Sequence, residues 1–465
     1  MSPAIRWRTA LARASVLAAA LTLSACGELK NPDQLGATDA GDAGDVPSDA
    51  TGDWRAYADA IGVYRDTGTV VEISVGPTHA CALLDGGHVR CWGDGSHGQL
   101  GYRSTEDVGD DETPASKGDV SLRGKATHVV AGGTHSCAVF DDGNIQCWGD
   151  GSQGQLGYGN TDDIGDDELP SDVGFVDVGA PVQELALGYQ HTCARLTTGQ
   201  VRCWGSGALG ALGYADKKNV GDKDPPRIKG DVILSTDITA GGAGAIAAGG
   251  NTSCVITNGV RCWGDNTLGQ LGYGHAGDLI GDDETPAKLN DIDIGYKPSK
   301  ISTGGNHTCV VASTGEVVCW GLGDRGALGH GDLTAIGATT TPAMANAIVT
   351  LGSPAIDVSA SELTTCARLE QSDVRCWGAG DDGELGYGNT RDIGDDELPA
   401  SVRSVNLGSK VSQVGTGAAY TCALMEGLVR CWGSPAHGEL GYGIPYTPHI
   451  GDAVVPSAVG YVPVE

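Results

Sequence analysis

Fourteen of the fifteen cysteines stand in seven pairs whose members lie eight to ten residues apart. Gly86 is the midpoint between Cys81 and Cys91, and glycine permits the left-handed backbone that a tight hairpin loop requires. The seventh pair has the two-residue turn Glu426-Gly427 at its centre. Because every spacing keeps the two sulfurs on one face of a hairpin, a disulfide can form in each pair. We therefore predict the disulfides Cys81–Cys91, Cys137–Cys147, Cys193–Cys203, Cys254–Cys262, Cys309–Cys319, Cys366–Cys376 and Cys422–Cys431.

Histidine precedes the first cysteine by two residues in four pairs, at His79, His135, His191 and His307. One histidine and two cysteines are typical zinc ligands, so each hairpin could hold a metal ion in place of a disulfide. Cysteines directly opposed on one hairpin suit a disulfide better, and an exported chain meets oxidising conditions. The three remaining copies carry, at the histidine position, Thr252, Thr364 and Tyr420. We expect each histidine to make a structural hydrogen bond within its own repeat.

Acidic tracts with the core Gly-Asp-Asp-Glu-x-Pro follow four of the hairpins. Clustered carboxylates in a loop could bind calcium, which takes about six to eight oxygen ligands, although the spacing matches no EF-hand. The alternative is a solvated loop whose isoleucine packs inward and whose acidic side chains cap the turn. No other cofactor is expected. The candidate calcium ligands are Asp110, Asp111, Glu112, Asp166, Asp167, Glu168, Asp282, Asp283, Glu284, Asp395, Asp396 and Glu397.

The hairpins belong to a unit that recurs seven times, with first cysteines 55 to 61 residues apart. Each unit continues as Cys-Trp-Gly and then as a glycine-rich turn. Short apolar runs between Gly, Asp and Pro clusters predict strands, and no apolar pattern of helical period appears after residue 30. A unit of about 50 to 60 residues is typical of a four-stranded propeller blade. For the second unit the expected strands are Ser116–Leu122 (irregular), Ala126–Ala131, Ser136–Phe140 and Asn144–Trp148.

Seven units predict an all-β fold, a seven-bladed β-propeller of four-stranded blades. The tail from Val455 to Val462 matches the opening strand of a blade, but no hairpin follows it. We predict that this C-terminal strand closes the first blade, begun at Val70, because closure leaves no sheet edge unpaired. The tryptophan after each second cysteine is expected to wedge between blades, where its burial stabilises the fold by about 2–3 kcal/mol.

The repeated residues closely resemble the regulator of chromosome condensation repeat: Gly-x-x-His-Ser/Thr, then Trp-Gly at the end of a hairpin, then Gly-Gln-Leu-Gly. The resemblance runs from Val70 to Val464 and implies a seven-bladed propeller. The paired cysteines look like those of exported bacterial members. The eukaryotic namesake is a guanine-nucleotide exchange factor that binds chromatin, and exchange activity here would rest on the family label alone. A net charge of −30 disfavours a nucleic-acid partner.

The first 25 residues have the features of an export signal, since basic residues precede an apolar stretch at 14–23 that is too short to span a bilayer. The junction Leu23-Ser24-Ala25-Cys26-Gly27 resembles the lipobox of bacterial lipoproteins, in which the cysteine carries lipid. An ordinary cleaved signal is the alternative. Gly27 in place of aspartate implies, in that family, retention in the outer membrane.

We accordingly expect four segments: a lipoprotein signal peptide at 1–25, a lipidated Cys26 with a disordered acidic tether at 26–53, a lead-in segment at 54–69, and the propeller at 70–465. The chain is expected to be exported and lipid-anchored to the bacterial outer membrane, on its periplasmic or surface face. Its only membrane contact would be the lipid.

The expected function is non-enzymatic binding of a protein or surface glycan by a monomeric propeller. No nucleophile–base constellation stands outside the repeat pattern. The alternatives are a lectin-like or calcium-dependent adhesion module, and an enzyme with its site at the channel mouth. Binding is expected in loops where the repeats differ, notably Ala240–Gly250 and Gly337–Thr341.

Overall fold

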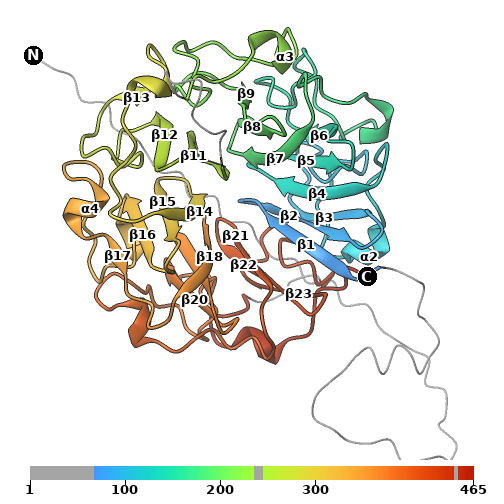
Figure 1. Ribbon diagram of the computed structural model, residues 1–465. Coiled ribbons are helices and arrows are strands. Elements are labelled where there is room, and N and C mark those ends of the chain that lie inside the picture. Colours follow the sequence, from blue (N-terminus) through green and yellow to red (C-terminus); the bar gives the residue numbers. More distant parts are fainter. Residues whose placement is uncertain (1–67, 235–243, 445–448) are drawn as a thin grey trace, which may run out of the picture. The chain divides into compact units, whose positions relative to one another are not determined.

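The computed structural model describes residues 68–234, 244–444 and 449–465. The predicted signal peptide, Cys26, the tether and most of the lead-in segment therefore lie outside the described residues, as does the first part of the loop at 240–250. The described residues form seven antiparallel sheets, which follow one another around a ring (Figure 1). We number these sheets as blades 1 to 7 in chain order.

Each blade is built on three consecutive strands. In blade order they are β1 (Val70–Val75), β2 (His79–Leu84), β3 (Val89–Gly93); β4 (Ala126–Ala131), β5 (His135–Phe140), β6 (Ile145–Gly149); β7 (Val182–Leu187), β8 (His191–Leu196), β9 (Val201–Gly205); β10 (Ile246–Gly249), β11 (Thr252–Ile256), β12 (Val260–Asp265); β14 (Pro298–Thr303), β15 (His307–Ala312), β16 (Val317–Gly321); β18 (Ala355–Ala360), β19 (Thr364–Leu369), β20 (Val374–Gly378); β21 (Gln413–Thr416), β22 (Tyr420–Met425) and β23 (Leu428–Gly433). A short fourth strand, β13 (Leu279–Ile280) or β17 (Ile348–Val349), extends blades 4 and 5.

The described helices are single turns. They are α2 (Pro114–Lys117), α3 (Pro226–Lys229) and α4 (Pro342–Ala345), with the 3-10 turns η1 (Pro170–Asp172), η2 (Pro286–Lys288), η3 (Asp324–Gly326), η4 (Pro399–Ser401) and η5 (Pro456–Ala458). Seven of these eight turns begin with a buried proline, whose fixed φ suits the first helical position.

The cysteine hairpins have the predicted register, because Cys81 faces Cys91 and the equivalent residues face each other in every blade. All seven predicted disulfides are present, with Cα–Cα distances between 4.0 and 4.2 Å. Glu426 and Gly427 both have positive φ, as the two-residue turn of the seventh hairpin requires. The hairpin strands are therefore locked at the same point in all seven blades.

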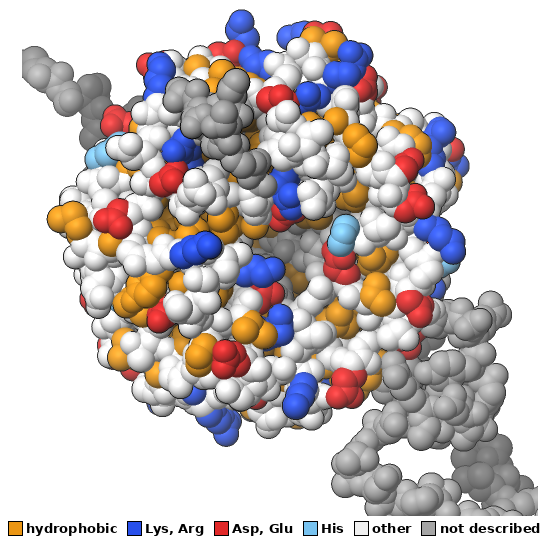
Figure 2. Space-filling view, viewed as in Figure 1, with side chains coloured by type: hydrophobic (Ala, Val, Ile, Leu, Met, Phe, Trp, Pro, Cys, Tyr) orange, Lys and Arg blue, Asp and Glu red, His pale blue; other side chains and the backbone are white. Residues whose placement is uncertain are grey.

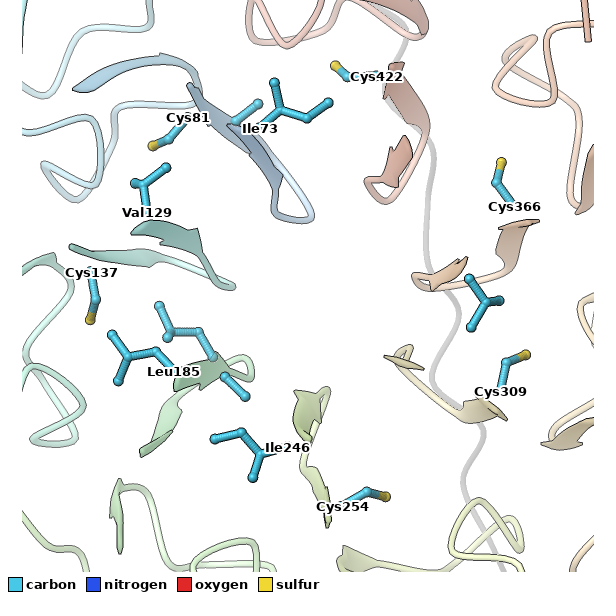
Figure 3. Packing of buried hydrophobic residues seen from close by; sticks show 14 of the residues in the cluster. Ile73, Cys81, Val129, Cys137, Leu185, Ile246, Cys254, Cys309, Cys366 and Cys422 are labelled. Carbon is cyan, nitrogen blue, oxygen red and sulfur yellow. The ribbon is translucent and has the colours of Figure 1, made fainter. Parts of the chain in front are cut away.

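The hydrophobic core fills the spaces between neighbouring blades. Ile73, Val129, Leu185 and Ile246 occupy one position on successive inner strands and lie between neighbouring sheets (Figure 3). The seven tryptophans that follow the second cysteines are buried, as the wedge interpretation requires. Since each blade covers only its neighbours, the core is continuous around the ring.

The outer edge of each blade differs from the prediction. Val120 donates its N–H to Val89 in blade 1 (2.8 Å), and the segment that contains Val120 thus belongs to the preceding hairpin rather than to the next blade. The first part of the strand expected at Ser116–Leu122 is α2. Like the other outer segments, the C-terminal segment pairs with the hairpin before it. The bridge between Val462 and Val429 places it in blade 7 instead of closing blade 1.

The ring is closed by a repeated contact between blades. In each blade a backbone N–H at the short helical turn donates to a carbonyl in the outer segment of the blade before it. Ser171 donates to Ser121 in this way (2.9 Å), and at the last seam Ala115 of blade 1 donates to Pro463 of blade 7 (3.0 Å). The five homologous bonds are Arg227 to Asp177, Ala287 to Ile233, Ala343 to Asp293, Ala400 to Thr350 and Ser457 to Asn406. We call these seven backbone hydrogen bonds between blades the belt.

Candidate binding face

The histidines connect neighbouring blades, so the expected bond within one repeat is replaced by a bond between two repeats. His79 Nε2 lies 2.8 Å from Ser136 Oγ of the next blade. The homologous pairs are His135–Thr192, His191–Ser253 and His307–Thr365. Burial lowers the pKa of His135 to about 3 and those of the other three to about 4, so all four are neutral near pH 7.

The glycine-rich turn of each blade makes room for the tryptophan of the next. A side chain on Gly101 would put its Cβ 3.0 Å from Trp148 Nε1, and the φ of Gly101 is +80°. The turn carbonyl of Glu439 in blade 7 accepts a hydrogen bond from Trp92 Nε1 in blade 1 (2.9 Å). These turns are therefore scaffold, and they align the connections on one face of the ring.

Two faces follow from this arrangement. The turns from the innermost to the second strand, such as Gly76–Thr78, lie at one end of the blades, and we call this end the turn face. The cysteine hairpin loops lie at the opposite end, which we call the hairpin face. The long connections also start at the turn face, since Asp94 donates its N–H to the carbonyl of Thr78 (2.9 Å).

The acidic tracts contact the preceding blade, since Ser104 of blade 1 donates its N–H to the carbonyl of Gly165 in blade 2 (3.1 Å). Ile164 is buried and bridges to Gly149, which confirms that the isoleucine of the tract packs inward. The carboxylate oxygens of each acidic triplet lie within 4.8 Å of one another at Asp110–Glu112, Asp166–Glu168 and Asp282–Glu284. Because the residues of each triplet are consecutive in sequence, this proximity leaves calcium binding a prediction.

These triplets hold carboxylates that resist ionisation. Burial, assisted by the adjacent aspartate, raises the pKa of Glu112, Glu168 and Glu397 to about 7 and raises that of Glu284. Glu112 has a partial counter-charge, because Lys117 Nζ lies 3.5 Å from its Oε1. One buried oxygen each of Glu168 and Glu397 has no hydrogen-bond donor among the described residues. The triplets are therefore incompletely compensated.

Two groups of potential metal ligands at blade seams were not predicted: Asp94, Asp107 and His437, and His97, Asp150 and Asp163. The homologous seam between blades 5 and 6 is occupied by a guanidinium, since Arg325 forms an ion pair with Asp392. His437 likewise lies 3.1 Å from Asp107, and this hydrogen bond raises its pKa. A basic side chain, arginine at one seam and histidine at the other, thus links neighbouring blades through an aspartate.

A cavity of about 210 Å³ lies on the axis of the ring, bounded by the ends of the inner strands of all seven blades and by their turns. Its lining is mostly glycine, alanine and backbone, with the hydroxyls of Ser302, Ser359 and Thr416 among the few polar side chains. Figure 2 shows the hollow at the centre of one face, with charged side chains around its rim. Such a concave site with few polar groups has the general character of a ligand pocket.

Tyr189 and Glu362 line this cavity at the turn face. The hydroxyl of Tyr189, in blade 3, donates a hydrogen bond to the carboxylate of Glu362, in blade 6. The two residues lie 173 positions apart, and their side chains meet over Gly305 of blade 5. At the same position in the turn, the other blades carry small residues: Pro77, Gly133, Gly250, Gly305 and Ala418.

This pair was missed by sequence reasoning. Comparing the turns between repeats could have detected it, because a tyrosine and a glutamate replace small residues at one position. Burial raises the pKa of Glu362, and the carboxylate makes no ion pair with any described residue. Of the two loops that were predicted to bind, the loop at 240–250 lines the cavity with its residues 247–250. The other, Gly337–Thr341, is a tight turn closed by a hydrogen bond from the Gly337 N–H to the Thr340 carbonyl (3.0 Å).

Seven disulfides indicate an oxidising compartment such as the periplasm or the extracellular space. In the part of the chain that the structure describes, no helix is long and apolar enough to cross a membrane.

Comparison with known proteins gives a consistent set of matches. The family described as RCC1-like domain matches residues 22–393, and the regulator of chromosome condensation (RCC1) repeat matches residues 373–424. The ultraviolet-B receptor UVR8 of Arabidopsis thaliana is 30% identical over 379 residues, which are 80% of this chain and 79% of that protein.

Two further matches have narrower meaning. The E3 ubiquitin-protein ligase HERC2 of Mus musculus is 28% identical over 76% of this chain, but the match spans only 7% of HERC2. Among solved structures, yeast RCC1 (Prp20) bound to Kap60 superposes with a TM-score of 0.60 at 18% identity, covering 85% of this chain and 86% of that one. This likeness shows the fold.

Proposed function

The chain belongs to the family of proteins with an RCC1-like domain, and from this premise we propose that it is a non-enzymatic platform whose turn face binds a protein. The observation that carries the proposal is the Tyr189–Glu362 pair over the axial cavity. The repeats are otherwise uniform at this position, so the departure creates a distinct feature on one face only.

The partner class follows from charge and from fold. A net charge of −30 repels nucleic-acid backbones, so a protein or a glycan is favoured over a nucleic acid as the macromolecular partner. Yeast RCC1, a propeller of the same fold, was crystallised bound to the protein Kap60. We assign neither nucleotide-exchange activity nor ubiquitin-ligase activity to this chain, because a shared fold does not imply a shared activity.

A matched pair of variants in blade 3 tests the choice of face. Gln190 is exposed in the turn between β7 and β8, and Gln200 is exposed in the hairpin between β8 and β9. Gln190→Arg should reduce recovery of the partner from the producing cells in a pull-down, whereas Gln200→Arg should retain it. Equal recovery with both variants would reject the turn face as the binding surface.

We also propose that the platform is exported and held at the outer membrane by lipid on Cys26. The lipobox-like junction and the disulfides support this address. Growth with an alkyne-tagged fatty acid should label the wild-type protein and leave Cys26→Ser unlabelled. Label that persists in the variant would contradict lipidation at this cysteine.

Calcium is a further proposal, supported by the raised pKa values of the four glutamates and by the two buried oxygens that lack donors. A divalent cation would neutralise the acidic triplets and stabilise the tracts. In this role calcium is structural, since the tracts link neighbouring blades.

A further inference from the structure

Glu362 is an acidic side chain with no ion-pair partner among the described residues. Its carboxylate is half-buried at the end of the axial cavity, and its described partner is the neutral hydroxyl of Tyr189. Asp392, a partly buried acid at a blade seam, is by contrast paired with Arg325. Since a desolvated carboxylate is stabilised by a positive charge, the site is complementary to a cation.

We propose that the axial cavity binds an alkylammonium group, with the Glu362 carboxylate as its counter-ion and the Tyr189 hydroxyl as the donor that it displaces. The group could belong to a free amine or to a lysine side chain of a protein. The second source alone depends on the proposed function.

The lining fits an ammonium group better than other cations. An ammonium carries three N–H donors and no acceptor, so it needs several acceptor oxygens around one negative charge. The lining includes turn carbonyls and the hydroxyl of Thr303, which has no hydrogen-bond partner among the described residues. The hydroxyls of Ser302, Ser359 and Thr416 also line the cavity, although they already bond to neighbouring blades. A divalent metal ion would need more carboxylates than the one that the described lining supplies.

The volume of the cavity suits a short aliphatic chain. A volume of about 210 Å³ is several times the roughly 30 Å³ share of one water molecule, and the apolar part of the lining can pack against methylene groups. Val75, Ala131, Leu187 and Ile301 supply that apolar surface. An aliphatic stem with a terminal ammonium therefore satisfies both parts of the lining.

The test uses calorimetric titration of the full chain with two probes, n-butylamine and Nα-acetyl-lysine methylamide, and with Nα-acetyl-norleucine methylamide as the uncharged control. Both amines should bind and the norleucine derivative should not. Tighter binding of the lysine derivative than of butylamine assigns the site to a protein side chain, and equal binding assigns it to free amines. Absence of binding by both amines overturns the proposal.

Three variants locate the binding. Glu362→Gln should weaken amine binding by at least about tenfold, because a hydrogen-bonded charge pair is lost. Glu370→Gln, an exposed carboxylate on the hairpin of the same blade, should leave it unchanged. Tyr189→Phe removes the competing donor and should strengthen binding, which keeps the proposal testable even where Glu362→Gln fails to fold. Unchanged affinity in Tyr189→Phe and Glu362→Gln would contradict the assignment.

The proposed function can fail separately. Amine binding without any effect of Gln190→Arg on partner recovery would retain the cavity site and reject the turn face as a protein-binding surface. An effect of Gln190→Arg without amine binding would do the reverse.

Discussion

Single buried side chains determine how this molecule responds to acid. The four histidines between blades are buried and neutral, and each forms a hydrogen bond with a hydroxyl of the next blade. Their folded pKa values lie below the ordinary value of 6.5. Their contribution to stability is therefore complete above about pH 6.5 and is lost as the pH falls toward the folded pKa, because the unfolded chain binds the protons.

We predict that His135→Thr makes the protein less sensitive to acid. Threonine occupies this position in blades 4 and 6, so the blade can accommodate it. Between pH 7 and pH 5 the variant should lose about 2 kcal/mol less unfolding free energy than the wild type, since one histidine fewer is protonated on unfolding. Urea unfolding at both pH values measures this difference. An identical pH dependence in the two proteins would show that His135 is not buried and neutral.

At the scale of elements, the hairpin is the unit of stability. Each disulfide joins directly opposed residues of two adjacent strands and constrains a short loop of the unfolded chain. The blade then gains rigidity without a large local core, which suits a chain with only two phenylalanines.

We predict that the double variant Cys137→Ala/Cys147→Ala is less stable than the wild type by about 2–3 kcal/mol in urea unfolding without reductant. The difference should shrink when a reductant opens all bridges in both proteins. A double variant as stable as the wild type under oxidising conditions would mean that this bridge contributes nothing to the blade.

The acidic tract gives a second prediction at this scale. Because the pKa of Glu168 is raised from 4.5 to about 7, its contribution to stability is present below about pH 4.5 and is lost as the pH rises through 7. Without calcium, Glu168→Gln should therefore raise the melting temperature at pH 8 and leave it unchanged at pH 4.5.

Millimolar calcium should raise the melting temperature of the wild type at pH 8, and a chelator should reverse the rise. Glu168→Gln should show a smaller rise, because one ligand is lost. Melting that is insensitive to both additives would reject a structural calcium site at the tracts.

At the scale of the whole molecule, the ring depends on its last seam. The C-terminal segment supplies the carbonyl of Pro463 to Ala115 and that of Val464 to Arg90. The seam between blades 7 and 1 thus repeats the contact found at the other six seams, and it needs no strand shared between the chain termini.

We predict that removal of residues 461–465 opens this seam locally. The amide of Ala115 should lose protection from hydrogen exchange, whereas the homologous amide of Ser171, which donates to Ser121, should keep it. Mass spectrometry of exchanged peptides measures both. Continued protection of Ala115 in the truncated protein would contradict the proposed belt.

Contacts between residues close in sequence could be predicted, whereas contacts between distant residues could not. The disulfides could be predicted, because the sequence distance within a hairpin determines which residues face each other. The bond from His79 could not be assigned to Ser136, because packing between blades is invisible in one repeat. Tyr189 and Glu362 meet only when seven blades close a ring, so their separation of 173 residues hides the pair. The outer segment was assigned to the wrong blade for the same reason.

The turn face is the proposed protein-binding surface of this molecule. The most direct measurement is photo-crosslinking in intact producing cells, with a photoreactive amino acid at Gln190 on the turn face or at Gln200 on the hairpin face. We expect a discrete crosslinked protein from Gln190 alone, and we expect excess unlabelled propeller to compete it away. Crosslinks from Gln200 alone, or the same products from both positions, would contradict the claim.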